Sequence, residues 1–600
     1  MKTSKIAVLD FGGQYTHLIA RRIRQLKVYS EILNPDENEK KLEGFNGIIF
    51  SGGPHSVFEE TAPEFNKKIL DLRKPILGIC YGHQLLAKEL GGKVEQGKVK
   101  EYGSAELKVK ENKLFKGLKA KEKIWMSHGD EVLALPQGFQ LIGETDSCKY
   151  AAMASDEKKI YGVQFHPEVT HTRNGMKILE NFLFKVCRCS KSWSIENFLE
   201  QKIQEIKQKA ENKKVFLLAS GGVDSTVCLA LLSRALRSEK VYSLHINNGF
   251  MRKNESKFVE ESLKKINYGN FHIADYSDFF FQKISKETDP EKKRKIIGEA
   301  FLEAKDLEIK KIGLNEEEWI LAQGTIYPDT IESGGTKHAS KIKTHHNRVD
   351  KILEMIKHGK IIEPIQELYK DEVRELGQLL ALPENLINRH PFPGPGLSIR
   401  VLGELKENKL ENEKETEEKI NELISEFNLK AKILPVKSVG VQGDARTYKN
   451  PVVLFGELNW SNLRKASNLI ANKVPEINRV TFCLTQKNPE KIRFIPCIIS
   501  KERVSLLREA DAVVNEIQEK KDIEKEIWQF PVVLVPVSFE GNEKESIVLR
   551  PINSTEAMTA NFYEMKKEIL NEMTEKLMQL NVSAVLFDLT DKPPGTIEWE

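Results

Sequence analysis

The sequence of 600 residues predicts two successive α/β domains, followed by an α+β region that contains an internal repeat. A chain of this length has too many residues for a single hydrophobic core, which favours three or more domains. Up to about residue 400, short apolar stretches alternate with amphipathic ones, as is typical of sheets covered by helices. After that point, one series of apolar stretches occurs twice.

Composition excludes several classes of protein. The chain has 92 Lys and Arg residues against 88 Asp and Glu residues and no long basic block, so charge does not indicate a nucleic-acid partner. No apolar stretch approaches the roughly 20 residues of a membrane span, so no membrane partner is expected. The stretch Lys2–Phe11 is interrupted by Asp10 and is predicted as a first strand, not a signal peptide. Only 7 cysteines, widely scattered, indicate a reducing, cytoplasmic location.

The first predicted domain spans residues 1–190. Its expected strands are Ile6–Leu9, Gly47–Phe50, Pro75–Ile79 and Tyr161–Phe165. Cys80 follows the third of these strands, has Gly78 and Gly82 two residues away on each side, and precedes a helical pattern. A sharp turn from strand to helix needs small neighbours and exposes a nucleophile, and a helix N-terminus lowers the pKa of a thiol. Cys80 is therefore predicted to be a nucleophile, with a buried structural cysteine as the alternative.

A base and a carboxylate follow another predicted strand of the same domain. His166 and Glu168 are two residues apart, so their side chains point the same way at the end of that strand. A thiol nucleophile needs a nearby base, and that base needs an orienting carboxylate. Cys80, His166 and Glu168 are therefore the predicted catalytic residues.

These motifs resemble the class I glutamine amidotransferases. That family hydrolyses glutamine with a Cys-His-Glu triad, and the resemblance implies ammonia as the useful product. It also implies an oxyanion hole in the segment Ser51–Pro54, with the amides of Gly53 and Tyr81 facing the oxyanion. Gln84 is implied to help bind the substrate glutamine.

The second predicted domain spans residues 191–400. Its expected strands are Val215–Ala219, Val241–Ile246, Phe271–Ala274 and Trp319–Gln323. The run Ser220-Gly221-Gly222-Val223-Asp224-Ser225 lies between the first strand and a helical pattern that begins at Thr226. Small residues let a backbone approach phosphate oxygens, and the helix start favours a polyanion. Asp224 is a predicted ligand for a metal that bridges phosphates, whereas the alternative for the whole run is a serine-rich turn without a ligand.

The run resembles the pyrophosphate loop of the N-type ATP pyrophosphatases, which implies an adenine-nucleotide α-hydrolase-like fold. Members of that family adenylate a substrate oxygen and release pyrophosphate, after which a nucleophile displaces AMP. The resemblance implies Mg²⁺ with ATP as the cofactor. The implied ATP-binding residues are Ser220, Gly221, Gly222, Val223, Asp224, Ser225, Thr226 and Lys343.

The third predicted region spans residues 401–600. It opens with a charged helical pattern, Glu404–Asn428, and then contains the repeat. The first copy runs from Leu434-Pro435-Val436 to the strand pattern 478–485, and the second from Val535-Pro536-Val537 to 581–590. A chance recurrence of apolar strands is the alternative.

Five further segments make the chain similar to the GMP synthetase family over nearly its whole length. These segments are His245–Arg252, Leu321–Asp329, Ile342–Asn347, Arg389–Leu397 and Lys592–Glu600. The resemblance implies a carbon-nitrogen ligase with the substrates XMP, ATP and glutamine, which forms GMP, AMP, pyrophosphate and glutamate. The implied XMP-binding residues are Arg252, Asp444, Gln529, Lys592 and Glu598.

Several points stay open from the sequence. Lys343, His345 and His346 lie in a segment that the resemblance implies is a lid, and Asp329 and Glu332 are either nucleotide-binding or ordinary loop residues. The segment Arg389–Leu397 is either a ligand loop or a domain linker. The doubled C-terminal region resembles the longer form of the family and leaves a monomer and a homodimer both possible.

Two other functions compete with this interpretation. The first is another ammonia-dependent N-type ATP pyrophosphatase, such as a NAD synthetase, although those usually carry a nitrilase-like partner domain. The second is a non-catalytic nucleotide-binding scaffold, which the two intact sets of catalytic residues argue against.

Overall fold

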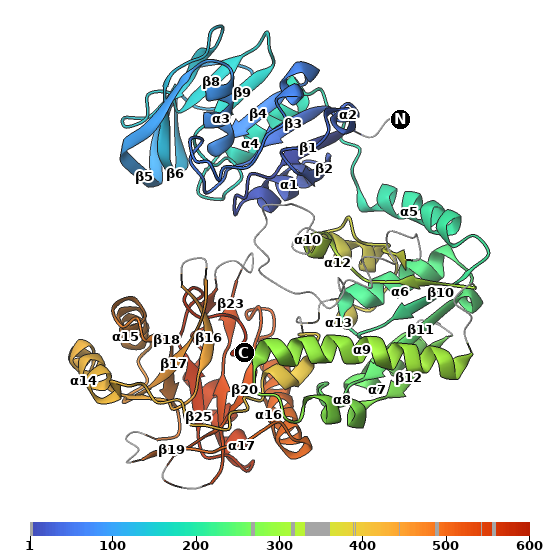
Figure 1. Ribbon diagram of the computed structural model, residues 1–600, viewed down its shortest axis with the longest axis vertical. Helices are drawn as coiled ribbons and strands as arrows, with labels where there is room; N and C mark the ends of the chain where they lie inside the picture. The colour runs from blue at the N-terminus through green and yellow to red at the C-terminus, as the bar shows by residue number, and fades with distance from the viewer. Residues whose placement is uncertain are drawn as a thin grey trace. The chain divides into compact units, whose positions relative to one another are not determined.

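The computed structural model describes residues 4–600 apart from 266–269, 314–317, 331–360, 388, 390–391, 443–444, 487–490, 540, 542 and 555–559. The chain forms two compact units (Figure 1). Unit 1 consists of Met1–Glu211 and Gln323–Ala381, and unit 2 consists of Asn212–Ala322 and Leu382–Glu600. Among the described residues, none of the helices has the length and apolar character that crossing a bilayer requires.

Unit 1 is built on a nine-stranded sheet with the order β2-β1-β3-β4-β9-β8-β7-β5-β6. The first five strands in this order are parallel, and the pairings from β9 to β6 are antiparallel. The four strands expected for this domain correspond to β1, β3, β4 and β9. The strands are β1 (Lys5–Leu9), β2 (Tyr29–Leu33), β3 (Gly47–Phe50), β4 (Ile76–Ile79), β5 (Lys93–Val109), β6 (Lys121–Ala134), β7 (Gln140–Glu144), β8 (Ala152–Ser155) and β9 (Ile160–Val163).

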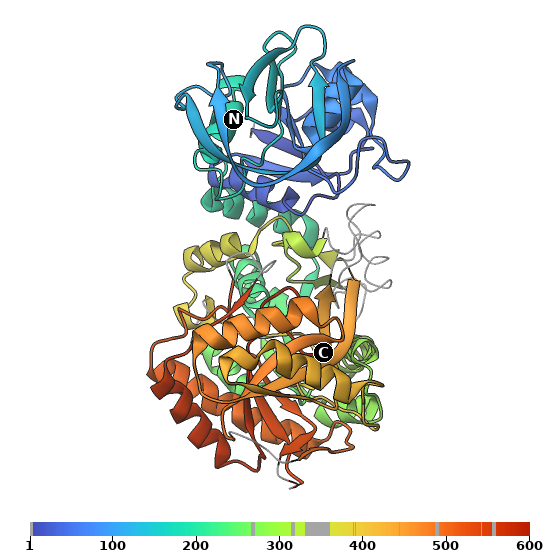
Figure 2. The same ribbon diagram turned by 90° about the vertical axis from the view of Figure 1, so that its left-hand side faces the viewer.

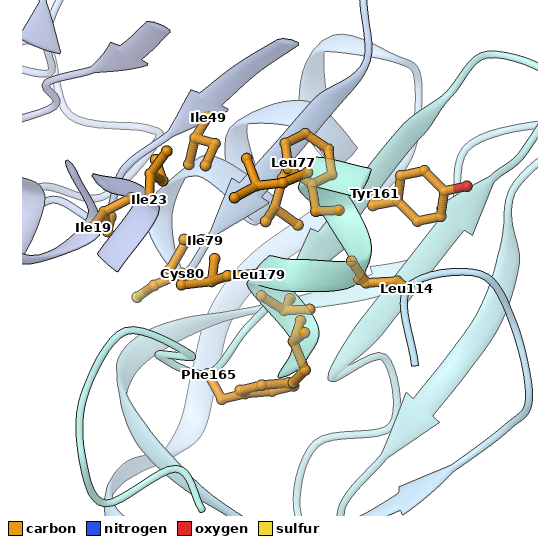
Figure 3. Packing of buried hydrophobic residues seen from close by; sticks show 14 of the residues in the cluster. Ile19, Ile23, Ile49, Leu77, Ile79, Cys80, Leu114, Tyr161, Phe165 and Leu179 are labelled. Atoms are coloured by element: carbon orange, nitrogen blue, oxygen red, sulfur yellow. The ribbon is translucent and has the colours of Figure 1, made fainter. Parts of the chain in front are cut away.

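The parallel part of this sheet is buried on both faces. Ile6 and Val8 of β1 belong to one hydrophobic cluster, and the alternate residues Ala7 and Leu9 belong to another. A strand buried on both faces reads as a continuous apolar run, which is why the sequence identified it. Figure 3 shows part of the first cluster. The helices of unit 1 are α1 (Thr16–Gln25), α2 (Glu39–Leu42), α3 (Tyr81–Glu89), α4 (Gly175–Asn181), α5 (Ile195–Ala210), α10 (Tyr327–Thr330) and α12 (Lys370–Leu379), and the short strand β14 spans Ile361–Ile362.

Unit 2 begins with a parallel sheet that has the strand order β12-β11-β10-β13. All four strands expected from the sequence are present: β10 (Lys214–Leu218), β11 (Val241–Asn247), β12 (Phe271–Asp275) and β13 (Trp319–Ala322). The chain order reverses at β10, because β11 lies on one side of it and β13 on the other. In such sheets, ligands bind outside the carboxyl ends of the strands at this switch point. The helices are α6 (Val223–Ala235), α7 (Glu255–Lys265), α8 (Ser277–Ile284), α9 (Pro290–Ile312) and α13 (Glu384–Ile387).

The rest of unit 2 contains a mixed sheet whose main path is β15-β17-β18-β25-β22-β20, with β16 paired to β17. Read from either edge, the path gives an antiparallel pair, then a parallel pair, and the two halves meet in the antiparallel pair β18/β25. A helix links the parallel strands in each half, α15 in one and α17 in the other. The predicted fold class, including an α+β region with two repeats, is therefore confirmed. The strands are β15 (Lys430–Ile433), β16 (Ser438–Gln442), β17 (Ala445–Phe455), β18 (Ile477–Cys483), β20 (Val532–Val535), β22 (Ser546–Leu549) and β25 (Val585–Asp588).

Helices cover the faces of this sheet. The yellow and orange helices α14 (Glu413–Leu423) and α15 (Trp460–Lys473) lie on the face that is turned to the viewer in Figure 2. The other two helices are α16 (Lys501–Lys520) and α17 (Lys567–Met578), and two small pairs are formed by β19 (Ile492–Phe494) with β21 (Val537–Phe539) and by β23 (Ile552–Asn553) with β24 (Asn561–Phe562).

The charged helix predicted over Glu404–Asn428 is shorter in the structure. Only Glu413–Leu423 forms α14, followed by a single 3₁₀ turn at Ser425–Phe427. The carboxylate of Glu404 accepts a hydrogen bond from the backbone N–H of Lys437, 3.1 Å away. The backbone of Glu404 also accepts one from Cys497. These tertiary contacts hold the first part of the segment in an irregular conformation and override its local helix propensity.

The last residues of the chain are anchored inside unit 2. Asp588 is fully buried and lies 2.9 Å from both Arg479 and Arg550. The indole N–H of Trp599 donates to the same carboxylate at 2.8 Å. Burial raises the pKa of Asp588, but the two guanidinium groups outweigh this effect and hold its pKa below the usual range. The C-terminal segment is therefore part of the folded core.

Replacing Asp588 with asparagine is expected to lower the free energy of unfolding of unit 2 by about 3 kcal/mol, because two buried arginines lose their counter-charge. Urea denaturation followed by hydrogen exchange of peptides from 585–600 measures this loss. Asp522→Asn is the control, since the Asp522 side chain is 84% exposed. Equal urea midpoints for the two variants would contradict the expectation.

Candidate functional site

Cys80 lies at the turn between β4 and α3 of unit 1. Its backbone has φ 51° and ψ −105°, and its side chain is buried. A Cβ added to Gly78 would lie 2.5 Å from the carbonyl oxygen of Gly82, and a Cβ added to Gly82 would lie 2.5 Å from that of Phe50. The two flanking glycines are therefore required for this turn. Figure 3 shows Cys80 beside Ile79 and Leu179 at the border of the hydrophobic cluster.

The structure brings the three predicted catalytic residues together. Nδ1 of His166 lies 2.7 Å from Oε1 of Glu168, and both side chains are buried. Burial lowers the pKa of His166, but the Glu168 carboxylate and a hydrogen bond with the Cys80 side chain outweigh burial and hold that pKa well above its usual range. An imidazolium paired with a carboxylate on one side and a thiol on the other is suited to thiolate chemistry.

Two backbone amides near Cys80 are available to a ligand. Within the described part of the chain, the N–H groups of Gly53 and Tyr81 donate to no other protein group. Tyr81 is the first residue of α3, so its N–H is one of the unpaired donors of a helix start. A Cβ on Gly53 would lie 2.6 Å from the carbonyl oxygen of Phe11, so this strand end also requires glycine.

Gln84 lies behind the thiol and is almost fully buried. Its Nε2 donates to the carbonyl oxygen of Asp130 at 2.7 Å and to Oε1 of Gln164 at 3.2 Å. Gln84 thus connects Asp130 to Gln164, whose side-chain nitrogen lies beside the Cys80 sulfur. Its predicted role in holding glutamine remains a prediction.

The sequence interpretation missed two residues beside the thiol, Ser127 and Gln164, and the pair Ser56 and Asp130, which Gln84 links to Gln164. The Cys80 thiol donates to the carbonyl oxygen of Ser127 at 3.4 Å, and Nε2 of Gln164 lies 3.7 Å from the Cys80 sulfur. Oγ of Ser56 donates to Oδ2 of Asp130 at 2.5 Å. The polar run 127–130 within a strand of otherwise alternating character was the available signal, but only the sheet brings it beside Cys80.

The predicted phosphate loop of unit 2 connects β10 to α6. Gly221 has φ +80°, and a Cβ there would lie 2.7 Å from Cγ2 of Val259. The hydroxyls of Ser220 and Ser225 are 3.1 Å apart, and Ser225 and Thr226 both donate to the carbonyl oxygen of Gly222 at 3.0 Å.

Residues outside the loop hold its backbone in place. Arg389 donates to the carbonyl oxygen of Gly221 at 3.2 Å and forms an ion pair with Glu255 at 2.7 Å. The N-cap residue of α6 is Gly222, which has no side chain to cap the helix. Val223 and Asp224 form the first turn of this helix. The loop therefore presents a helix N-terminus at the switch point of the sheet, where a polyanion is favoured.

The predicted acceptor residues fall into three groups. Arg252 and Glu598 belong to one cluster in unit 2 and have side chains that are 18% and 16% exposed. Arg400 holds Glu598 through two hydrogen bonds of 2.8 and 3.0 Å. Gln529 pairs through its backbone with Ile552, and Lys592 pairs through its backbone with Ala560. The remaining predicted acceptor residue, Asp444, lies outside the described residues. The predicted ATP-binding residue Lys343 also lies outside them, as do Glu332, His345 and His346.

Replacing Glu168 with glutamine is expected to lower the glutaminase rate by about 10²-fold or more, because the base loses its orienting carboxylate. The pKa of His166 is raised by Glu168, so the variant imidazole gives up its proton at a lower pH. Since imidazolium must protonate the leaving ammonia, the alkaline limb of the pH–rate profile is expected to move to lower pH. Glu157→Gln, an exposed change in the same domain, is the control. An alkaline limb that stays in place would contradict this assignment.

Three family descriptions match the chain. Residues 7–186 match the family described as glutamine amidotransferase class-I. Residues 193–301 match NAD synthase. Residues 413–494 and 515–599 match the GMP synthase C terminal domain, in two stretches that each contain one half of the C-terminal sheet.

Curated relatives cover the chain from end to end. A probable glutamine-hydrolyzing GMP synthase of Leptospira interrogans is 47% identical over 99% of this chain and 99% of its own length. A probable GMP synthase of Caenorhabditis elegans is 37% identical over 99% of this chain and 92% of its own length. A GMP synthase of Aquifex aeolicus is 43% identical over 100% of its own length but only 82% of this chain.

Proposed function

The chain belongs to the family of glutamine-hydrolysing GMP synthases, and from this premise we propose how its residues perform the reaction. XMP, ATP, glutamine and water are converted to GMP, AMP, pyrophosphate and glutamate. The observation that carries the proposal is the presence of two sets of candidate catalytic and binding groups on one chain. One is the buried Cys80, His166 and Glu168 of unit 1, and the other is the Ser220–Ser225 loop at the switch point of unit 2.

Unit 1 releases ammonia from glutamine. The Cys80 sulfur attacks the side-chain amide carbon of glutamine, and the amides of Gly53 and Tyr81 donate to the oxygen that becomes negatively charged. His166 protonates the leaving nitrogen, and ammonia departs as a thioester forms. Water then hydrolyses the thioester to glutamate and restores the thiol.

Unit 2 activates XMP with ATP. The oxygen at C2 of XMP attacks the α-phosphorus of ATP and pyrophosphate leaves, which turns that oxygen into part of a good leaving group. Ammonia then attacks C2, and AMP departs. The loop residues Ser220–Ser225 and Thr226 bind the phosphates through hydroxyl and backbone N–H groups.

We assign Mg²⁺ to the same loop. Asp224 supplies a carboxylate in the first turn of α6, next to the serine hydroxyls. Among the described residues, no cluster of three or more His, Cys, Asp or Glu side chains could form a complete metal cage. This donor set fits Mg²⁺, which is usually held by one or two carboxylates together with substrate phosphates. When bound, Mg²⁺ neutralises charge on the phosphates and on the departing pyrophosphate.

The acceptor nucleotide is assigned to Arg252, Glu598, Gln529, Lys592 and Asp444. Arginine and lysine side chains suit the monophosphate of XMP. Glu598 is held firmly by Arg400, so its carboxylate has a fixed position for hydrogen bonds from a purine. Lys343 is assigned to ATP.

An assay with purified protein, Mg²⁺, ATP and XMP tests the proposal directly. Glutamine and ammonium chloride are compared as nitrogen sources while GMP and AMP are measured. Turnover with both sources is expected. The match to NAD synthase makes nicotinate adenine dinucleotide the appropriate second acceptor. AMP release with that acceptor and not with XMP would overturn the assignment, and no reaction with either would favour a non-catalytic scaffold.

We also propose that the chain is a cytoplasmic monomer or weak dimer. The central strands β18 and β25 pair with each other inside one chain, which covers the edges that an unrepeated domain would leave open. Sedimentation at micromolar protein tests this, and a stable dimer would contradict it.

A further inference from the structure

Helix α16 contains a stretch that lies between the two matched parts of the C-terminal domain. Its residues 501–514 fall after the match to 413–494 and before the match to 515–599. This part of the helix is therefore not covered by that family match.

Arg508 of α16 holds the loop that carries Arg252. Its Nε donates to the carbonyl oxygen of Met251 at 2.9 Å, and its Nη2 donates to that of Gly249 at 2.5 Å. Gly249 has φ +79°, and a Cβ there would lie 2.8 Å from the ring of Phe281. The loop is therefore tightly packed at Gly249. Arg508 donates hydrogen bonds to the residues on both sides of Phe250.

Asp511, one turn further along α16, lies between two arginines of the acceptor cluster. Its carboxylate is 3.7 Å from Nε of Arg252 and 4.0 Å from Nη1 of Arg400, and the residue is 2% exposed. Asn515 donates to Oδ2 of Asp511 at 2.8 Å, which fixes the carboxylate. Both guanidinium groups lie over the ring of Phe392, at 4.5 and 5.4 Å from its centre.

The two arginines keep hydrogen-bonding capacity for a ligand. Nε of Arg252 and Nη1 of Arg400 are buried and have no hydrogen-bond partner among the described residues. Burial and the nearby Arg400 lower the pKa of Arg252, although Asp511 opposes this. Such a pair of buried cations is stabilised by a further anion.

An open cavity adjoins the cluster on the α16 side. It has a volume of about 490 Å³ and is lined by Arg252, Ser256, Ser277, Lys501, Ser505 and Arg508, among others. This volume is within the range of small-molecule sites. Arg252 and Arg508 thus lie on the wall of this cavity.

We propose that α16 is part of the acceptor site and that Arg508 and Asp511 are positioning residues, which set the place of Arg252 relative to Glu598 for the binding of XMP. Arg508 fixes the backbone of the loop, and Asp511 fixes the charged ends of Arg252 and Arg400. This inference rests on the proposed function, because it assumes that Arg252 and Glu598 contact XMP.

The test measures steady-state kinetics of the full chain for Asp511→Asn and Arg508→Met. Each variant is expected to raise the KM for XMP about tenfold, because Arg508→Met removes two hydrogen bonds that hold the loop and Asp511→Asn removes the negative charge beside Arg252 and Arg400. The KM for ATP and the kcat at saturating XMP are expected to stay within about twofold to threefold, because neither residue touches the phosphate loop. Glu516→Gln is the matched control, since that side chain is 70% exposed on the same helix. The control is expected to match the wild type.

The outcomes distinguish a failure of the proposed function from a failure of the inference about α16 alone. A wild-type chain that does not convert XMP defeats the proposed function. A wild-type chain that converts XMP, with an unchanged KM for XMP in both variants, defeats only the inference, as does a parallel rise of the KM for ATP. Thermal unfolding checks that each variant is folded, and Arg508→Lys replaces any variant that is not. Arg508→Lys keeps the positive charge but removes the bidentate hydrogen bonding to the carbonyl oxygens of Gly249 and Met251. It is therefore also expected to raise the KM for XMP.

Discussion

Synthesis of GMP from glutamine is expected to be lost in the Cys80→Ala variant, while synthesis from ammonium chloride continues near the wild-type rate. The thiol is the only nucleophile that the geometry offers to glutamine beside His166 and Glu168 within the described residues. Its removal should lower the glutaminase rate at least about 10⁴-fold. External ammonia bypasses this step, because it supplies the product of the first reaction directly. The measurement is GMP formation with each nitrogen source at saturating XMP and ATP.

Cys189→Ala is the control for this experiment. Cys189 belongs to the same unit, is only partly buried and has no assigned role. Its variant should keep both activities. Loss of ammonium-dependent synthesis in folded Cys80→Ala protein would contradict the assignment of the two reactions to separate sets of residues.

The Asp224→Ala variant is expected to lose synthesis with both nitrogen sources, by at least about 10²-fold, because ATP can no longer be held together with its metal. Glutamine hydrolysis depends on residues of unit 1, so its chemistry remains intact. The measurement is pyrophosphate release with XMP, as a function of Mg²⁺ concentration. A raised requirement for Mg²⁺ would distinguish a metal ligand from a residue that only shapes the loop.

Glu239→Ala is a suitable comparison, because Glu239 is an exposed acidic residue in the same unit. It should leave pyrophosphate release unchanged. Asp224→Ala protein that releases pyrophosphate at the wild-type rate would remove Asp224 from the metal and phosphate role.

The sequence predicted four of the nine strands in the main sheet of unit 1 and all four strands of the sheet β12-β11-β10-β13 in unit 2, because buried parallel strands leave a direct signal in apolar runs. It placed Cys80 and the Ser220–Ser225 loop correctly at turns between strand and helix, since such turns require glycine at fixed positions. It overestimated the helix at Glu404–Asn428, because local propensity does not include the contacts of Glu404 with Lys437.

The proposed acceptor site was predicted less completely. Arg252 and Glu598 could be named from the sequence, but Arg400, Arg508 and Asp511 could not. Arg400 lies in an apolar stretch and Asp511 lies on a long charged helix. Neither sequence pattern indicates which residue the side chain will contact, because partners far apart in sequence meet only after folding.

The sequence by itself therefore determined the kinds of chemistry that this protein carries, because glycine turns, nucleophiles and phosphate loops are local patterns of a few residues. Tertiary structure alone decided the pairing of the two C-terminal repeats through β18 and β25, and the position of Asp511 between Arg252 and Arg400. These features depend on burial and on charges brought within a few ångströms of each other, and the energies of both are set by neighbours that are distant in the chain.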